Sequence, residues 1–128
     1  MNAASACPCG SGKAYVACCG PYLDHAQRPA TAEALMRSRY SGYVFARGDY
    51  LLRTWHESTR PEKLDLNDAG VVNWLGLKII RKEAGGPDDT RGVVEFVARY
   101  KVGGKAHRLH ETSRFVREGG PWFYLDGV

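Results

Sequence analysis

The chain has 128 residues, of which 44% are hydrophobic and 25% are charged. This length fits one ordinary domain with a small addition, and the composition excludes global disorder. Lysine and arginine exceed aspartate and glutamate by 18 to 14, and the resulting formal charge of +4 hints only mildly at nucleic acid. No apolar run reaches the roughly 18 residues of a membrane-spanning helix. The first residues lack the basic start and apolar stretch of a secretory signal.

All four cysteines of the chain lie close together near the N-terminus, at Cys7, Cys9, Cys18 and Cys19. A secreted domain held by disulfides would spread its cysteines through the fold, so the clustering indicates one local site. Four thiolates complete the tetrahedral coordination of a structural Zn²⁺ and leave no open position for a catalytic water. The alternatives are buried thiols or a redox pair, although the Cys-x-x-Cys sequence of a thioredoxin-type site is missing. We therefore expect one structural zinc ion bound by these four residues.

The residues between the cysteines favour a compact turn around the metal. Gly10 and Gly12 allow a positive φ, which lets backbone N–H groups approach the thiolates. Ser11 can cap a short helix that presents the second cysteine pair, and Gly20-Pro21 is expected to end that helix. About 20 residues cannot build their own core, so metal binding is expected to fold this segment. Four thiolates with one Zn²⁺ carry a charge of −2, which lowers the formal net charge to about +2 and weakens the nucleic-acid hint.

Two helices are predicted after the cysteine segment. Apolar residues recur at helical spacing over 32–44, with Thr31 as the N-cap and Gly48 as a stop. Asp49 can cap a second, short helix that ends by Pro61.

From Trp74 onward the apolar period changes to two residues, which is typical of strands. Gly103-Gly104 has the form of a two-residue hairpin turn. Helices followed by an antiparallel meander of about four strands predict an α+β fold. The residues expected to share one face of their strand are Leu75, Leu77 and Ile79 in the first strand, Val94, Phe96, Ala98 and Tyr100 in the second, and Leu109, Glu111, Ser113 and Phe115 in the third.

The stretch from Cys7 to Cys19 reads C-P-C-G-S-G-K-x-Y-x-x-C-C and resembles the SEC-C motif, which was first described at the C-terminus of the SecA translocase motor. The last ligand of that motif is commonly His, and Cys19 takes its place here. In SecA the module docks the SecB chaperone and the ribosome. The resemblance implies that residues 1–28 form a zinc-binding docking motif. Its contact face would include Lys13, Tyr15 and Tyr22.

The remaining residues, 29–128, resemble the YchJ-like family of small bacterial proteins. The resemblance is carried by L-M-R-S-R-Y-S-G-Y at 35–43, T-W-H-E-S-T-R-P at 54–61 and W-F-Y-L-D-G at 122–127, among other stretches. It implies a nuclear transport factor 2-like (NTF2-like) cone, in which N-terminal helices pack on a curved antiparallel sheet. It implies an architecture rather than an activity.

A cone of this kind leaves a pocket between helices and sheet, and polar residues on its walls are candidates for ligand binding. A carboxylate on an apolar face, such as Glu111, is either paired or made into a general base, with His56 and His110 as candidate partners. The structural alternative is that the aromatic residues form core and that Glu111 pairs with Arg39 or Arg99. The candidate ligand-binding residues are Tyr40, Tyr43, Trp55, His56, Arg60 (a possible anion clamp), His110, Glu111 and Ser113.

The function favoured by these features is that of a non-catalytic zinc-binding protein whose SEC-C motif docks a protein, a ribosome or a chaperone. The alternative is a small-molecule-binding protein or enzyme that uses the cone pocket. Direct nucleic-acid binding ranks last because no basic stripe or aromatic platform stands out. No catalytic residue is assigned and no membrane partner is expected. Free thiols or a thiolate–zinc site suit a reducing cytoplasm, where we expect the protein.

Overall fold

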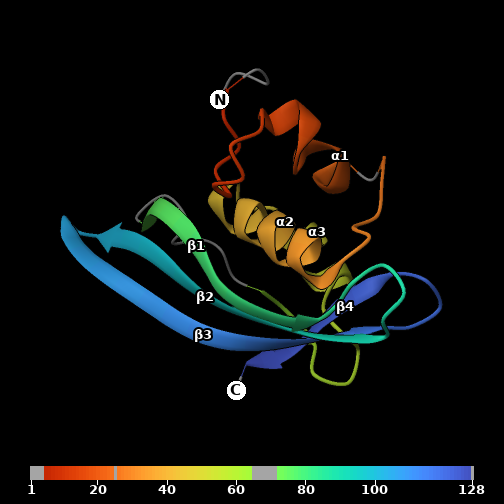
Figure 1. The fold of residues 1–128 in the computed structure, drawn as a ribbon. Coiled ribbons are helices and arrows are strands. Elements are labelled where there is room, and N and C mark those ends of the chain that lie inside the picture. The colour runs from red at the N-terminus through yellow and green to blue at the C-terminus, as the bar shows by residue number, and fades with distance from the viewer. Residues whose placement is uncertain (1–4, 25, 65–71, 128) are drawn as a thin grey trace.

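The computed structural model describes residues 5–24, 26–64 and 72–127 (Figure 1). Helices precede strands, as predicted for this α+β chain, and no helix in these ranges is both long and apolar enough to cross a bilayer. The elements are the 3₁₀ helix η1 (Tyr15–Ala17), the helices α1 (Gly20–Leu23), α2 (Ala32–Val44) and α3 (Gly48–Arg53), and the strands β1 (Val72–Ala84), β2 (Arg91–Val102), β3 (Lys105–Arg117) and β4 (Trp122–Gly127).

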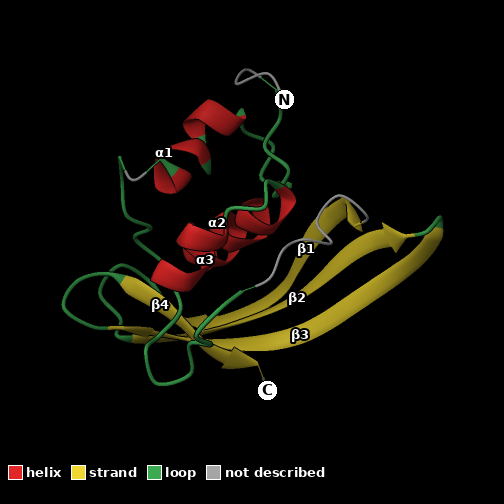
Figure 2. Cartoon of the chain, turned by 180° about the vertical axis from the view of Figure 1, so that it is seen from behind, coloured by secondary structure: helices red, strands yellow, loops and turns green. Residues whose placement is uncertain are grey.

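The four strands form one antiparallel sheet in the order β1-β2-β3-β4. The sheet curves, and α2 and α3 lie on its concave side, as Figures 1 and 2 show from opposite directions. Gly103 and Gly104 join β2 to β3 with φ of 57° and 80°. Both values are positive, as a two-residue turn of this kind requires, so the predicted hairpin is confirmed. The result is the helix-on-curved-sheet cone that was expected.

Helix α2 begins where the sequence predicts, because the Thr31 side chain accepts a hydrogen bond from the Ala34 N–H at 3.0 Å. The predicted stop at Gly48 is wrong, since Gly48 is instead the first residue of α3. The chain turns at Ala46, which has a φ of 55°. That left-handed conformation is held by the next residue, Arg47, whose N–H donates to the Gly42 carbonyl at 2.8 Å.

Helix α3 is also capped differently from the prediction. Its N-cap is Arg47, and Asp49 lies in the first turn rather than at the cap. Asp49 is nevertheless placed where a negative charge interacts favourably with the helix dipole. The helix ends at Arg53, well before Pro61.

A β-bulge changes the faces of the first strand. The pairing of β1 with β2 shifts between Trp74 and Gly76, which leaves Leu75 as an extra residue. Leu75 is 44% exposed, whereas Leu77 and Ile79 pack against the core. The prediction that these three residues share one face is therefore wrong at Leu75.

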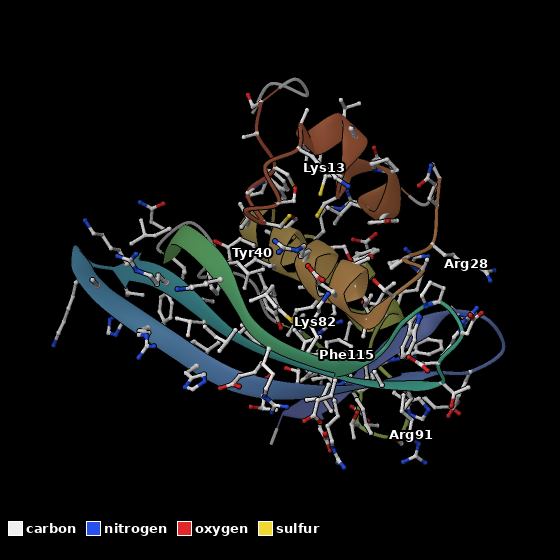
Figure 3. All side chains as sticks on the ribbon, viewed as in Figure 1. Lys13, Arg28, Tyr40, Lys82, Arg91 and Phe115 are labelled. Atoms are coloured by element: carbon white, nitrogen blue, oxygen red, sulfur yellow. The ribbon has the colours of Figure 1, made fainter. Side chains whose placement is uncertain are left out.

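The N-terminal segment, residues 5–24, lies on the side of α2 that faces away from the sheet (Figures 1 and 2). In Figure 3, Lys13 marks this segment, whereas Tyr40 on α2 and Phe115 on β3 mark the interface between helix and sheet. The segment and the cone nevertheless share one hydrophobic cluster. Its members include Cys7, Cys9, Cys19, Leu23, Leu35, Met36, Tyr40, Val94, Phe96, Phe115 and Trp122.

Candidate metal centre and cone cavity

The Sγ atoms of Cys7, Cys9, Cys18 and Cys19 all lie within 4.8 Å of one another. The Sγ of Cys18 lies 3.6 Å from that of Cys9 and 3.9 Å from that of Cys19. A tetrahedral zinc with Zn–S bonds of about 2.3 Å places its sulfur ligands about 3.8 Å apart. The four thiols are free, and these distances are far longer than the roughly 2.05 Å of a disulfide bond. The cluster therefore fits a tetrahedral metal ion.

The backbone of the N-terminal segment brings the two cysteine pairs together through two glycines and a serine. Gly10 and Gly12 have φ of 79° and 85°, as their position between the pairs predicts. Ser11 does not cap a helix, because its hydroxyl lies 3.1 Å from Cys18 Sγ and accepts a hydrogen bond from the Lys13 N–H. A 3₁₀ turn, η1, precedes the second pair in place of the predicted helix.

The prediction that Gly20-Pro21 ends a helix is wrong, because these two residues begin α1. Proline is favourable in the first turn of a helix, where its missing N–H has no intrahelical acceptor.

The thiol cluster is fixed to the rest of the molecule on two sides. From α2, Arg37 Nη1 donates to the Cys9 carbonyl at 2.8 Å, and the Ser41 hydroxyl lies 3.6 Å from Cys7 Sγ. From the sheet, the backbone of β1 approaches so closely that a Cβ at Gly10 would lie 3.1 Å from the Leu77 carbonyl oxygen. The metal centre is thus built partly by the cone.

Three of the four cysteines, Cys9, Cys18 and Cys19, have shifted pKa values. A hydrogen bond from the Cys19 thiol lowers the pKa of Cys9 to about 4. The same contact, together with burial, raises the pKa of Cys19, and burial raises the pKa of Cys18. In the metal-free cluster these pKa shifts favour the thiolate at Cys9 and the protonated thiol at Cys18 and Cys19. A divalent cation would release those protons on binding.

A groove of about 450 Å³, here called the rim groove, runs beside the thiol cluster and the start of α2. Of the three residues that the SEC-C resemblance places on a contact face, Lys13 and Tyr22 line this groove. Tyr15 does not, because its ring packs against Phe45 with centroids 5.2 Å apart. The groove also contains Val16, whose side chain is 58% exposed.

A second hollow of about 270 Å³, here called the cone cavity, lies between α2, the chain after α3 and the sheet. Five of the eight predicted ligand-binding residues line it, and its other walls are mainly aromatic and aliphatic. The lining residues are Met36, Arg39, Tyr40, Tyr43, Trp55, Trp74, Phe96, Ala98, Leu109, Glu111, Ser113 and Tyr124.

The other three predicted residues, His56, Arg60 and His110, are not among those that line the cone cavity. On the exposed side of the sheet, His110 Nε2 contacts Glu95 at 2.6 Å. His56 Nε2 lies 3.0 Å from a Glu118 carboxylate oxygen, at an ion-pair distance but without hydrogen-bond geometry. Arg60 Nε donates to the Trp55 carbonyl at 2.9 Å.

Arg39 is a cavity residue that the sequence interpretation did not select. It is 4% exposed, and its Nη1 donates to the Leu51 carbonyl at 2.7 Å and to Thr54 Oγ1 at 2.8 Å. Burial lowers the pKa of Arg39 from its usual range, which starts so high that the guanidinium stays charged at neutral pH. Helical spacing in the sequence could have predicted this position, because Arg39 follows the buried Leu35 by four residues and so lies on the same face of α2.

Glu111 forms no ion pair with Arg39 or Arg99 in the described part of the chain, so the predicted structural pairing is not seen, although Tyr40, Phe96 and Phe115 do belong to the core as that alternative expects. Its Oε2 accepts a hydrogen bond from Ser113 Oγ at 2.5 Å and a longer one from the Tyr124 hydroxyl at 3.4 Å. Burial and the neighbouring carboxylate raise the pKa of Tyr124 to about 12, so this hydroxyl is a neutral donor.

Comparison with known proteins agrees with this architecture at both ends of the chain. Residues 31–127 match the family model of the YchJ middle NTF2-like domain, and residues 5–21 match the SEC-C motif. This chain belongs to the YchJ family. The YchJ resemblance, the NTF2-like cone and the N-terminal SEC-C motif predicted from the sequence are thereby confirmed.

Related proteins of the YchJ family cover nearly the whole chain. A UPF0225 protein of Chromobacterium violaceum is 62% identical over 99% of this chain and 95% of its own length. A UPF0225 protein of Ralstonia nicotianae is 55% identical over 96% of this chain and 90% of its own length.

Two solved structures share the fold. The solution structure of a SEC-C motif containing protein from Rhodopseudomonas palustris is 36% identical, with a TM-score of 0.83 over 100% of this chain and 98% of that one. The crystal structure of a SEC-C motif containing protein from Psychrobacter arcticus is 29% identical, with a TM-score of 0.77 over 94% of this chain and 80% of that one.

Proposed function

We propose that this YchJ-family chain is a non-catalytic zinc-binding protein whose SEC-C motif serves as a docking module for a protein partner. The observation that carries the metal assignment is the approach of four thiol sulfurs to within 4.8 Å of one another. Thiolate ligands favour Zn²⁺ over hard cations such as Mg²⁺ and Ca²⁺. Four of them complete a tetrahedral shell, so the ion has a structural role.

The zinc assignment is tested by metal content. Full-length protein purified under reducing conditions is expected to contain one zinc per chain by mass spectrometry. Cys7→Ser and Cys18→Ser each remove one thiolate and are expected to lose most of that zinc. A Val16→Asp protein changes the surface beside the cluster but keeps all four thiols, so it retains the metal. Stoichiometric zinc in both cysteine variants would rule out the four-thiolate site.

The docking role is supported by the rim groove. The groove combines an exposed apolar side chain, Val16, with the polar Lys13 and the amphipathic Tyr22. Aromatic and apolar residues within a polar rim are features of protein contact surfaces. The motif is rigidly attached to α2, so a partner bound in the groove would also be held beside the cone.

The docking role is tested with two exposed apolar residues on different surfaces. Val16→Asp places a charge in the rim groove, whereas Ile80→Asp makes the same change on β1, where Ile80 is 47% exposed. Proteins or ribosomal particles that cross-link to the full-length chain in a bacterial extract are expected to be lost with Val16→Asp and kept with Ile80→Asp. Equal recovery with both variants, or no enrichment over a tag-only control, would contradict docking through the groove.

The second candidate function is small-molecule binding in the cone cavity. The observation in its favour is a hollow of about 270 Å³ with mainly apolar walls and two charged side chains, Arg39 and Glu111. Ligand sites commonly combine apolar walls with a few placed polar groups. The volume lies slightly below the usual range for drug-sized ligands, so the ligand would be small.

A further inference from the structure

The cone cavity contains a buried cation that forms no direct ion pair in the described part of the chain, although the Glu111 carboxylate attracts it from a distance. Of the five N–H donors of the Arg39 guanidinium, those on Nη1 are used by Leu51 and Thr54. Its Nε and Nη2 groups donate to no described residue. Burying an arginine without a counter-charge is costly, and proteins ordinarily pair such a group.

Two aromatic rings hold the guanidinium in place without neutralising it. Its central carbon lies 5.1 Å from the centroid of the Trp55 ring and 4.7 Å from that of Tyr124. Backbone hydrogen bonds of 2.8 Å, from the His56 N–H to the Tyr124 carbonyl and from the Tyr124 N–H to the Thr54 carbonyl, fix the chain after α3 to β4. The position of Arg39 is thus set by its surroundings before any ligand binds, as preorganised sites require.

A second donor without an acceptor lies in the same wall. Trp55 lines the cavity, and its Nε1 is one of two buried side-chain polar atoms that lack a hydrogen-bond partner within the described ranges. Buried N–H groups are rarely left without an acceptor, and an exception calls for a missing partner. The Arg39 guanidinium lies over the Trp55 ring, so the indole N–H reports on the surroundings of Arg39.

The remaining charge in the cavity sets the orientation of such a ligand. The Glu111 carboxylate forms no ion pair with Arg39 and is bonded instead to Ser113 and to the Tyr124 hydroxyl. Tyr124 therefore has the cation over its ring and the anion at its hydroxyl. An anionic group is attracted to the Arg39 end and repelled from the Glu111 end.

We propose that the cone cavity binds a small monocarboxylic acid with an aromatic or aliphatic body, its carboxylate on Arg39 and its body against the rings of Tyr40, Tyr43 and Trp74. The Nε and Nη2 groups form one edge of the guanidinium, and that edge matches a carboxylate in a bidentate pair. A single cation balances one negative charge, which favours a monoanion over a phosphate dianion. This inference rests on the second candidate function and adds the class of ligand to it.

The test uses benzoate and its neutral analogue benzamide as probes on the full-length, zinc-loaded protein. The readout is the indole N–H signal of Trp55 in a ¹H–¹⁵N correlation spectrum, assigned with Trp55→Phe. Trp122 is an internal reference, because it lies outside the cavity lining and its Nε1 already donates to the Ala30 carbonyl at 3.1 Å. Benzoate is expected to shift the Trp55 signal saturably and leave Trp122 unmoved, with benzamide at least about tenfold weaker.

Arg39→Met removes the charge at similar length and is expected to abolish the preference for benzoate, while an unchanged Trp122 signal reports an intact fold. Equal affinity for both probes, or a benzoate response that persists in Arg39→Met, would overturn the carboxylate assignment but leave ligand binding in the cavity standing. If neither probe binds saturably up to about 10 mM, both the ligand site and its class are rejected. The zinc and docking proposals are independent of these outcomes.

Discussion

Gly92 of β2 lies where the hairpin between β1 and β2 meets the start of α2. A Cβ at this position would lie 2.6 Å from the Cα of Gly85 and 3.0 Å from the Cβ of Ala32. The Ala32 N–H also donates to the Gly85 carbonyl at 2.9 Å. The start of α2 therefore contacts the bare backbone of the β1–β2 hairpin. This contact holds one end of the helix close to the sheet.

Gly92→Ala is expected to destabilise the protein, because the new methyl group meets backbone atoms that cannot rotate away. Overpacking of this kind costs about 1–3 kcal/mol in the free energy of unfolding. Gly76→Ala is the matched control, since a Cβ there would have no neighbour within 4 Å and its φ is not positive. It is expected to leave stability unchanged or to raise it by up to about 1 kcal/mol.

Urea unfolding of the two variants and the unaltered protein measures the difference. Equal free energies of unfolding for Gly92→Ala and Gly76→Ala would contradict this prediction, because the helix would then move away from the hairpin without loss of stability.

At the scale of single elements, the sequence predicts those features that local patterns control. Alternation of apolar and polar residues places Val94, Phe96 and Ala98 on one face of β2, and the structure buries all three. The Thr31 cap and the Gly103-Gly104 turn are local signals of the same kind. The bulge at Leu75 is not predictable in this way, because it depends on how β1 pairs with β2.

The same distinction applies to the two candidate sites. The four cysteines are close in the sequence, so their assembly follows from spacing and turn residues. The cone cavity instead depends on contacts between α2, the chain after α3 and the sheet, which no local pattern encodes. Because neighbouring residues of a strand point to opposite faces of the sheet, the sequence itself places His110 and Glu111 on opposite faces of β3. The sequence suggests Arg39 only as a partner for Glu111, and its place between the Trp55 and Tyr124 rings depends on tertiary contacts.

At the scale of the whole molecule, the SEC-C motif and the NTF2-like cone are packed together around one hydrophobic cluster. Cys7, Cys9 and Cys19 belong to the same hydrophobic cluster as residues of α2, β2 and β3. Arg37 links α2 to the backbone of the motif, and β1 contacts it at Gly10. A metal ion bound by the cysteines would therefore stabilise the cone as well as the motif.

The most direct test of this account is the thermal unfolding of full-length protein with and without a strong zinc chelator under reducing conditions. Structural zinc contributes roughly 10–16 kcal/mol of apparent binding free energy, which is comparable with the whole stability of a small domain. Removal of the metal is therefore expected to lower the midpoint of the single transition by more than about 10 °C, with tryptophan fluorescence and far-ultraviolet circular dichroism changing together. An unchanged midpoint, or a separate early transition confined to residues 5–24, would contradict the claim that zinc holds motif and cone together.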